Sequence, residues 1–249
     1  MNMGKKYMDA LDKIKDIFAN GSDSIWSVAD ISYSDFKDNF ARAIVIAQQY
    51  KFFITNEEYN EEKYHHLLVE GRAAINKKVN LLKQLFDRYG IKNYIPPMSQ
   101  SDETELVAPF SFKYAAVQAG LGWIGKSGVL VTKEFGPRVL LAAILIDYPL
   151  DSGSPINKSL CQDCFACVDA CPWGIIKGVN WTISSRRDEL LDFQFCNKQR
   201  SEYIESNGRK HTCGYCILAC PWGLSNKRPD SDSALGIPTQ LLPEGFSHQ

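Results

Sequence analysis

Apolar residues recur at helical spacing in two stretches of the chain. The first stretch covers residues 7–18, and the second is the latter half of the Glu-, Lys- and Leu-rich segment 56–89. Spacings of three and four residues place these side chains on one face of a helix. Gly90 stands where a C-cap glycine would end the second helix. A third, shorter helix is predicted over 109–118, where the glycines that follow stop it.

Short apolar runs predict strands between and after these helices. Residues 43–47 form a run of the kind found in buried strands, and residues 129–132 and 139–146 indicate two more. A Phe-Gly-Pro turn at 135–137 joins the last two strands.

Proline, glycine, serine and aspartate accumulate between residues 147 and 159, which indicates a domain boundary. We predict an upstream domain over residues 1–155 and a cysteine-rich module over residues 156–226. A C-terminal tail with little periodicity follows over residues 227–249.

Charge and hydropathy narrow the classes of protein that this chain can represent. The 249 residues include 28 Lys and Arg against 29 Asp and Glu, a net charge of −1, which excludes a globally basic nucleic-acid binder. No apolar run approaches the ~20 residues of a membrane helix. The N-terminal segment, residues 1–18, carries charged residues along its whole length, unlike a secretory signal. We therefore expect a soluble, cytoplasmic protein with no membrane association.

All eight cysteines lie between Cys161 and Cys220, and the residues before them contain none. A reducing cytoplasm does not maintain disulfides, so clustered cysteines in such a protein point to metal. The sequence Ala-Cys-Pro-Trp-Gly occurs at 170–174 and again at 219–223, which indicates a module built from two similar halves.

The first half has the cysteine spacing of bacterial ferredoxins, with a proline after the fourth cysteine: Cys161, Cys164, Cys167 and Cys171. In that pattern three thiolates hold one 4Fe–4S cluster and the fourth binds the other cluster. The second half lacks one cysteine of the pattern, and Cys196 is the one left to supply it. We therefore assign one cluster to Cys161, Cys164, Cys167 and Cys220, and the other to Cys171, Cys196, Cys213 and Cys216.

Structural zinc is the alternative for these cysteines, because four-cysteine zinc sites also use Cys-x2-Cys pairs. The complete ferredoxin spacing followed by proline favours the two clusters. Two clusters this close form an electron relay. The long upstream domain indicates that the relay delivers electrons to something bound there.

Three short motifs precede the cysteines: Glu-Gly-Arg at 70–72, Ala-Pro at 108–109 and Ala-Gly-Leu-Gly-Trp-Ile-Gly-Lys at 119–126. Their order, with the cysteine run behind them, resembles the epoxyqueuosine reductase family over roughly residues 41–223. That family reduces the epoxide of a queuosine precursor on tRNA, using cobalamin and two 4Fe–4S clusters, and its core is similar to that of reductive dehalogenases. The resemblance implies an α+β fold, with a mixed α/β corrinoid-binding-type domain followed by a bacterial two-cluster ferredoxin-like module.

The resemblance also implies that cobalamin is held between this domain and the ferredoxin-like module. Glycines let the backbone approach a flat macrocycle, Lys126 can meet a propionamide or phosphate, and apolar strands can supply a floor. The alternative is that the glycines make a tight helix-to-strand turn and that Trp123 is a core residue. The candidate cofactor-binding residues are Gly122, Trp123, Gly125, Lys126, Leu130 and Leu141.

One departure from the family concerns the proton donor. The family carries an aspartate two residues before the Ala-Pro pair, and Leu106 stands at that position here. A leucine cannot donate a proton, so the candidate catalytic residues are Glu105, in a shifted loop register, and Tyr114. We therefore expect a substrate other than epoxyqueuosine-tRNA, and the near-zero net charge also disfavours a large tRNA footprint.

These observations predict an iron–sulfur oxidoreductase. A ferredoxin- or flavodoxin-type donor would supply electrons, which the two clusters would relay to cobalamin for reduction of a small-molecule or protein-bound substrate. The alternative is an electron-transfer or corrinoid-reducing protein that acts on a protein partner and has no organic substrate of its own. A third hypothesis is a two-cluster protein whose upstream domain only docks partners.

Overall fold

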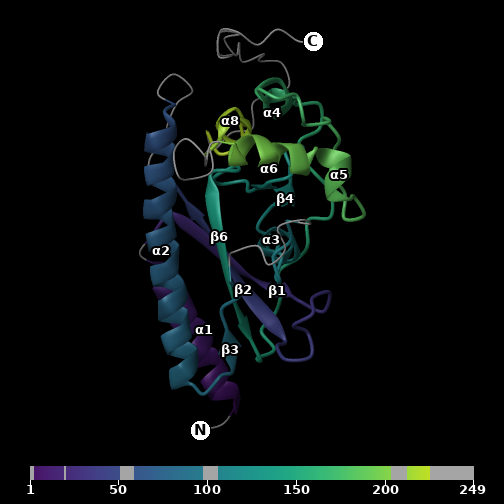
Figure 1. The fold of residues 1–249 in the computed structure, drawn as a ribbon. Coiled ribbons are helices and arrows are strands. Elements are labelled where there is room, and N and C mark those ends of the chain that lie inside the picture. The colour runs from purple at the N-terminus through teal and green to yellow at the C-terminus, as the bar shows by residue number, and fades with distance from the viewer. Residues whose placement is uncertain (1–2, 20, 51–58, 98–105, 203–211, 225–249) are drawn as a thin grey trace. The chain divides into compact units, whose positions relative to one another are not determined.

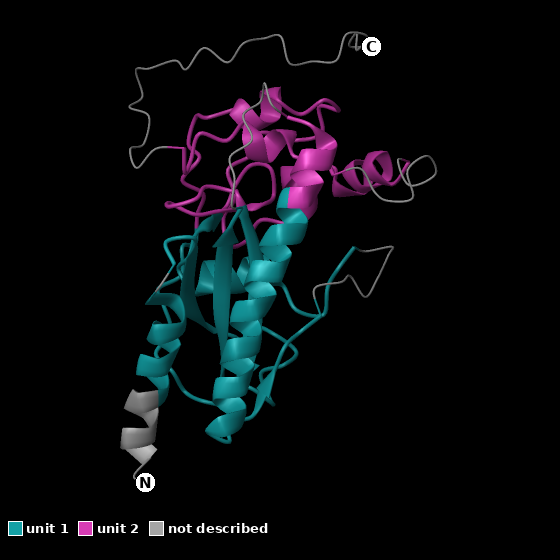
Figure 2. Ribbon diagram, turned by 90° about the vertical axis from the view of Figure 1, so that its left-hand side faces the viewer, with its two compact units in different colours: residues 1–51, 67–123, 139–157 teal, residues 52–66, 124–138, 158–249 magenta. Residues whose placement is uncertain are grey.

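The structure is a computed structural model, and it describes residues 3–19, 21–50, 59–97, 106–202 and 212–224 (Figure 1). The chain divides into two compact units (Figure 2). Unit 1 comprises residues 1–51, 67–123 and 139–157, and unit 2 comprises residues 52–66, 124–138 and 158–249. None of the helices in the described ranges is long and apolar enough to cross a membrane.

Unit 1 is built on a four-stranded antiparallel sheet with the strand order β1-β2-β6-β3. Its strands are β1 (Ser24–Asp30), β2 (Arg42–Gln49), β3 (Asn93–Tyr94) and β6 (Val139–Ile146). The register places Ile44 of β2 opposite both Val28 and Ile144. β2 and β6 are buried along nearly their whole length. Because successive side chains of a strand point to opposite faces, both faces at the centre of the sheet are covered.

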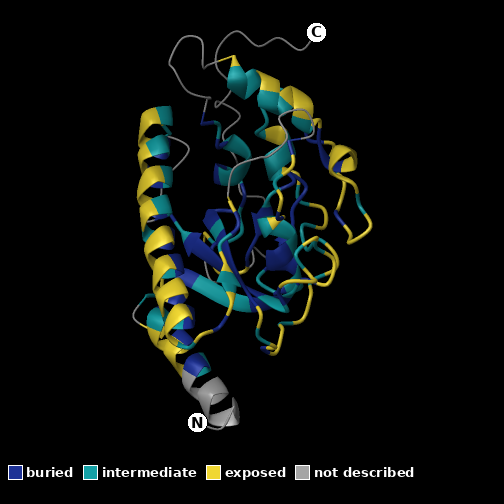
Figure 3. Cartoon of the chain, turned by 60° about the horizontal axis from the view of Figure 1, so that its bottom comes forward, coloured by how far each residue is buried: buried dark blue, intermediate teal, exposed yellow. Residues whose placement is uncertain are grey.

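The helices of this unit are α1 (Met3–Ala19), residues 67–88 of α2 (Glu61–Arg88), and α3 (Phe112–Gln118). α3 contacts β1, β2 and β6, and α1 contacts β1. The apolar stripe of α2 is buried, as the dark segments of Figure 3 show, and it consists of Ile75, Val79, Leu82 and Phe86. Gly71 of α2 approaches the sheet closely, since a Cβ there would lie 2.8 Å from Cδ1 of Leu140.

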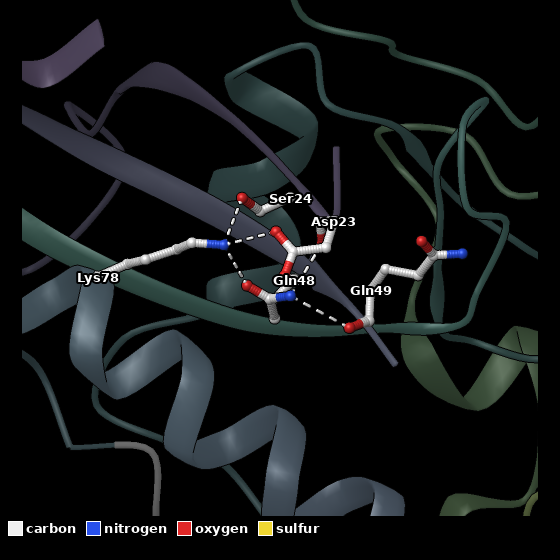
Figure 4. A network of polar contacts seen from close by, with 5 residues as sticks. All are labelled: Asp23, Ser24, Gln48, Gln49 and Lys78. Atoms are coloured by element: carbon white, nitrogen blue, oxygen red, sulfur yellow. Dashed lines mark hydrogen bonds and ion pairs between the residues drawn. The ribbon is translucent and has the colours of Figure 1, made fainter. Parts of the chain in front are cut away.

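A polar network fastens α2 to the sheet (Figure 4). The Lys78 ammonium donates to Asp23 Oδ1 at 2.9 Å, and to Ser24 Oγ and Gln48 Oε1 at 2.7 Å each. Gln48 is fully buried, and its side-chain amide donates to the Asp23 carbonyl oxygen at 2.9 Å. An ammonium has three donors, so these three acceptors satisfy it.

Two helices of unit 1 end on a glycine with positive φ. Gly90 has φ +61°, and the amides of Gly90 and Ile91 donate to the carbonyl oxygens of Asp87 and Phe86. α3 ends in the same way at Gly120, which has φ +74°. Both ends are Schellman caps, in which glycine adopts the left-handed conformation at low cost. The predicted glycine stops of both helices are confirmed.

The predicted strands over 43–47 and 139–146 are confirmed as parts of β2 and β6. The predicted strand over 129–132 contains only the short β5 (Leu130–Val131), which pairs with β4 (Trp123–Ile124). β5 and β6 therefore belong to different sheets, and the two are not a strand pair. The sequence pattern does not indicate β1, because its buried positions do not alternate along the strand.

Unit 2 consists of short helices joined by loops: α4 (Ala166–Asp169), α5 (Arg187–Leu190), α6 (Phe193–Ser201) and α8 (Tyr215–Leu218). α4 and α8 contact each other and occupy equivalent places in the internal sequence repeat. The unit also takes in residues 124–138, which precede β6 in the chain. The predicted domain limits, with one cut near residue 155, stay a prediction.

Candidate iron–sulfur site

The first cysteine run folds as a tight loop followed by one helical turn. The Cys164 amide donates to the Cys161 carbonyl oxygen at 3.0 Å, which closes the loop. α4 begins after Phe165 and carries Cys167. The Cys171 amide then donates to the carbonyl oxygen of Val168 at 3.1 Å, just beyond the helix. The helix therefore separates Cys171 from the cysteines of the loop.

The second run repeats this backbone conformation. The residue before α8, Gly214, has φ −129° and ψ 3°, and the residue before α4, Phe165, has φ −116° and ψ 6°. Gly174 and Gly223, which end the repeated sequence, have φ +60° and +77°. The two halves therefore share a local fold as well as a sequence.

The thiols of the first predicted quartet lie close enough to affect one another's ionisation. Burial raises the pKa of the Cys167 thiol to about 11, with the charges of Cys161 and Cys164 acting in the same direction. Burial likewise raises the pKa of the Cys220 thiol to about 12, and the charges of Cys161 and Cys167 add to it. A thiol that is protonated in the empty protein must release its proton when it binds iron.

The second predicted quartet shows the same mutual effects. Burial raises the pKa of the Cys213 thiol to about 11, and the charges of Cys196 and Cys171 act in the same direction. Burial also raises the pKa of the Cys216 thiol, and the charges of Cys213, Cys171 and Cys196 raise it further. The charge of Cys167, from the other quartet, reaches Cys216 as well. At Cys216 the effect of Cys167 is larger than those of Cys171 and Cys196, so these effects do not separate the two proposed groups of four, and the ligand assignment stays a prediction.

All eight cysteines are free thiols. Within the described ranges, no group of three or more Cys, His, Asp or Glu side chains is placed to hold a single metal ion. A 4Fe–4S cluster does not need several side chains to converge on one metal ion, because each of its cysteines binds a different iron of the cube.

Lys126 is buried beside the first cysteine run. Only 2% of this residue is exposed, and its Nζ lies 3.7 Å from the centroid of the Phe165 ring. An ammonium over an aromatic face is attracted by the negative face of the ring. The neighbouring Gly125 packs against the same run, since a Cβ there would lie 3.7 Å from Cys161 Sγ and 2.9 Å from a Val131 methyl carbon.

Arg138 is a functional candidate that the sequence analysis misses. Its guanidinium donates to the carbonyl oxygens of Leu218, Cys220 and Trp222 at 2.9, 2.6 and 2.7 Å. The residue is 4% exposed, and its charge lowers the pKa that burial raises at Cys220. The one available signal is a charged residue at the start of an otherwise apolar strand. Its partners lie at least 80 positions further along the chain, so local patterns do not reveal them.

Three tyrosines surround the second cysteine run within unit 2. The ring centroid of Tyr59 lies 4.8 Å from that of Tyr215 and 6.0 Å from that of Tyr64. The Tyr59 hydroxyl donates to the Thr212 carbonyl oxygen at 3.0 Å, next to Cys213. Burial raises the pKa of Tyr59 and, to a smaller extent, that of Tyr215. The three rings form an aromatic cover beside the second cysteine run, where a Cβ on Gly214 would lie 2.7 Å from a Tyr64 ring carbon.

The candidate cofactor-binding side chains make their described contacts with the chain itself. Trp123 is fully buried, Leu130 is 3% exposed and Gly122 is buried. Leu141 is half-buried on β6, opposite Ala47 of β2. Gly125 and Lys126 lie against the first cysteine run, as described above. Corrinoid binding by these residues stays a prediction.

The catalytic candidates are described only in part. Tyr114 lies on α3, half-buried, and its ring meets that of Tyr33 edge to face with centroids 4.6 Å apart. Glu105 lies outside the described residues. Leu106 is 6% exposed and has φ +54°, a left-handed conformation that is uncommon for residues other than glycine. The catalytic roles stay predictions.

A protein-family model described as a 4Fe–4S double cluster binding domain matches residues 160–223, which include all eight cysteines. The curated relatives that match are named epoxyqueuosine reductase. The chain is similar to epoxyqueuosine reductases. It is 39% identical over 89 residues to that of Cyclobacterium marinum, a match to 36% of this chain and 26% of the relative. It is 33% identical over 124 residues to that of Salmonella typhimurium, covering 50% and 28% of the two chains.

The matched segments thus span between a quarter and a third of these relatives' lengths. Among solved structures, epoxyqueuosine reductase from Bacillus subtilis has the same fold at 17% identity, with a TM-score of 0.55, 90% of this chain and 68% of that chain covered. A reductive dehalogenase structure described as suggesting a mechanism for B12-dependent dehalogenation superposes with a TM-score of 0.58 at 17% identity, covering 86% and 32%. The mixed α/β fold of the epoxyqueuosine reductases and the double-cluster domain are therefore present, and the resemblance of the motifs is confirmed.

Proposed function

We propose that this iron–sulfur protein is an oxidoreductase of the epoxyqueuosine reductase type, in which two 4Fe–4S clusters carry electrons from an external donor to an acceptor. The observation that carries the proposal is the match of residues 160–223 to a 4Fe–4S double cluster binding domain, which includes all eight cysteines. The fold shared with an epoxyqueuosine reductase structure supports it. Clusters built on adjoining ligands favour electron transfer between them.

The acceptor that the fold favours is cobalamin, because one structural neighbour is described in terms of B12-dependent dehalogenation. Cobalamin, when bound, would supply a redox-active cobalt. Of the side chains selected for it from the sequence, Lys126 lies against Phe165 of the first cysteine run. The chain's own residues would hold the clusters: Lys126 and Arg138 lie beside ligands predicted for the first one, and the three tyrosines lie beside the second cysteine run.

The substrate is expected to differ from epoxyqueuosine-tRNA. Support comes from Leu106, which occupies the position of the family's proton donor and is apolar. A solved epoxyqueuosine reductase is described with an epoxyqueuosine-modified tRNA stem loop, so tRNA is the first substrate to assay. An electron donor of the ferredoxin or flavodoxin type is proposed, because the reduction potentials of iron–sulfur clusters extend down to about −700 mV.

Metal analysis of anaerobically purified protein tests the proposal. We expect about eight irons per chain, and one cobalt after incubation with cobalamin. About eight irons without cobalt would favour the alternative, an electron-transfer protein that reduces a protein partner. Zinc in place of iron would contradict the proposal altogether, and the absorption spectrum of the purified protein would show it directly.

A further inference from the structure

We propose that the cluster held by Cys161, Cys164, Cys167 and Cys220 has the higher reduction potential of the two, because Lys126 and Arg138 place buried positive charge beside it. This inference rests on the proposed two-cluster relay. It adds a direction, since electrons delivered to the pair come to rest on this first cluster. It also gives Lys126 a task other than contact with a corrinoid.

Lys126 supplies the stronger argument. Its Nζ lies over the Phe165 ring, 3.7 Å from the centroid, and Phe165 stands between Cys164 and Cys167 in the sequence. Within the described part of the chain, the recorded partner of this ammonium is that ring, with no acceptor oxygen beside it. A charge with 2% exposure is costly unless an opposite charge lies nearby. A thiolate-ligated cluster is such a charge.

Arg138 brings a second buried cation to the same quartet. Its guanidinium is fixed by three backbone carbonyl oxygens, one of them that of Cys220 at 2.6 Å. All three acceptors are neutral backbone dipoles. The hydrogen bond to the Cys220 carbonyl oxygen holds this charge against the backbone of a predicted ligand of the first quartet.

The second quartet has different surroundings. Among the described residues, the cations that act on Cys196 are Arg200 and Arg187, which are half-exposed and exposed, and Asp192 adds an opposing negative charge. Charges on the surface are screened by water and salt, and buried charges much less so. The tyrosine cover of the second quartet disfavours the more negative, reduced cluster, since burial without charge penalises added charge.

Reduction adds one negative charge to a cluster. A fixed cation stabilises the reduced form and therefore raises the potential. Removing a single buried charge near a cluster is expected to change the reduction equilibrium by about tenfold. For a one-electron couple, tenfold corresponds to ~59 mV.

The test uses the full chain, and its iron content is measured first. A reductive titration then gives the reduction potentials, with electron paramagnetic resonance used to follow the reduced clusters. We expect two reduction steps, and we expect Cys196→Ser, which keeps only the first quartet intact, to retain the higher one. Lys126→Gln should move the higher step by about tenfold, or ~59 mV, to lower potential and leave the other step in place. Lys126→Arg keeps the charge and should restore most of the shift. Lys133→Gln, an exposed lysine of the same segment, serves as the control.

Failure of the inference and failure of the proposed function look different. A wild-type protein without eight irons would contradict the two-cluster function itself. Eight irons with no shift in Lys126→Gln, with equal shifts in Lys126→Arg, or with the lower step retained by Cys196→Ser, would overturn the inference and leave the relay standing. If Lys126→Gln loses the first cluster while Lys126→Arg keeps it, the need for charge is supported. Loss of that cluster in both variants would make packing the cause and overturn the inference.

Discussion

The guanidinium of Arg138 donates a hydrogen bond of 2.6 Å to the backbone carbonyl oxygen of Cys220. The two residues lie 82 positions apart, and the same guanidinium also holds the carbonyls of Leu218 and Trp222. One side chain thus fixes the loop that presents a predicted cluster ligand.

Replacing Arg138 by methionine should release that loop. Three carbonyl oxygens, two of them in buried hydrogen bonds, would lose a charged donor, at a cost of about 3 kcal/mol or more. We expect the iron content to fall from about eight toward about four per chain, with the second cluster retained. Arg88→Met, at an exposed position of α2, is the matched control and should keep all its iron. Full iron content in Arg138→Met would show that the three hydrogen bonds from Arg138 are not needed to hold the cluster.

Gly174 and Gly223 offer a comparison within one molecule, because they occupy the same position of the internal repeat and both have positive φ. A Cβ on Gly174 would meet nothing within 4 Å, whereas one on Gly223 would lie 2.1 Å from the Phe135 carbonyl carbon. Gly174→Ala should therefore cost only the conformational penalty, about 1–2 kcal/mol. Gly223→Ala should cost more than about 3 kcal/mol, because the obstructing group is backbone.

Thermal scans at a fixed rate compare the two glycine variants, since iron–sulfur proteins lose their clusters on unfolding and do not unfold reversibly. The expected order of apparent melting temperatures is wild type, Gly174→Ala, then Gly223→Ala at a clearly lower value. Equal melting temperatures for the two variants would show that the contact between Gly223 and Phe135 has no energetic weight.

Cys196 is expected to be a cluster ligand although it lies outside both cysteine runs. It is half-buried on α6, and the charge of Cys171, from the proposed second quartet, contributes to raising the pKa of its thiol. Cys196→Ser should reduce the iron content from about eight toward about four per chain, or leave a labile second cluster. An unchanged iron content and unchanged reduction behaviour would refute the assignment.

Lys78 is expected to contribute strongly to the stability of unit 1. In Lys78→Met the buried Gln48 and Ser24 lose their donor, at a cost of about 1–3 kcal/mol. Lys83→Met, which removes an exposed ion pair with Asp87 on the same helix, should cost less than about 0.5 kcal/mol. Thermal scans of the two variants at neutral pH measure this difference, and equal melting temperatures would contradict the prediction.

The pH range over which Lys78→Met and Lys83→Met can be compared is set by the pKa of the Asp23 carboxyl group. Burial raises the pKa of its carboxyl group, but the hydrogen bonds from Lys78 and Gln48 outweigh burial, so the pKa lies below its ordinary value. Because the pKa of Asp23 is lower in the folded state, its ionised carboxylate stabilises the fold. This stabilisation is complete above the pKa of the unfolded state, ~3.9, and is lost as the pH falls through the pKa of the folded state. The effect of Lys78→Met should therefore be the same from ~pH 6 to ~pH 9.

Local patterns were sufficient to predict what is local in this fold. Helical spacing locates the buried stripe of α2, and Gly90 and Gly120 end their helices because a left-handed cap requires glycine there. The cysteine spacing identifies the double-cluster domain, since the loop and helical turn that hold three thiolates are short and contiguous.

Contacts between distant segments were not predictable in the same way. Residues 124–138 pack with the cysteine-bearing unit, while β6, which follows at once, pairs in the sheet of the other unit. Nothing in the local sequence of Gly125 and Lys126 indicates that they lie against the first cysteine run. A glycine-rich segment looks the same whether its partner is a ligand or the chain's own loop, so only the structure separates these cases.

The last prediction concerns Leu106 and the chemistry of epoxide reduction. Opening an epoxide to an alkene expels its oxygen, which needs a proton from a positioned acid. Loss of a general acid typically costs a factor of ~100 to ~10,000 in rate. We therefore expect the wild-type protein, reduced and supplied with cobalamin, to turn over epoxyqueuosine-containing tRNA very slowly or not at all. The assay rests on the proposed function, so the cobalt content is measured first.

Leu106→Asp is the variant that decides whether a missing acid is the cause. The backbone there has φ +54°, a conformation in which aspartate is more common than leucine, so the exchange suits the local backbone. With 6% exposure, burial would raise the pKa of the new carboxyl group and help it to keep a proton at neutral pH. Leu106→Asp should gain turnover, whereas Leu106→Asn, of the same shape but without that proton, should not. Wild-type turnover comparable to that of a known reductase would overturn the prediction, and its loss in Glu105→Gln would identify Glu105 as the acid.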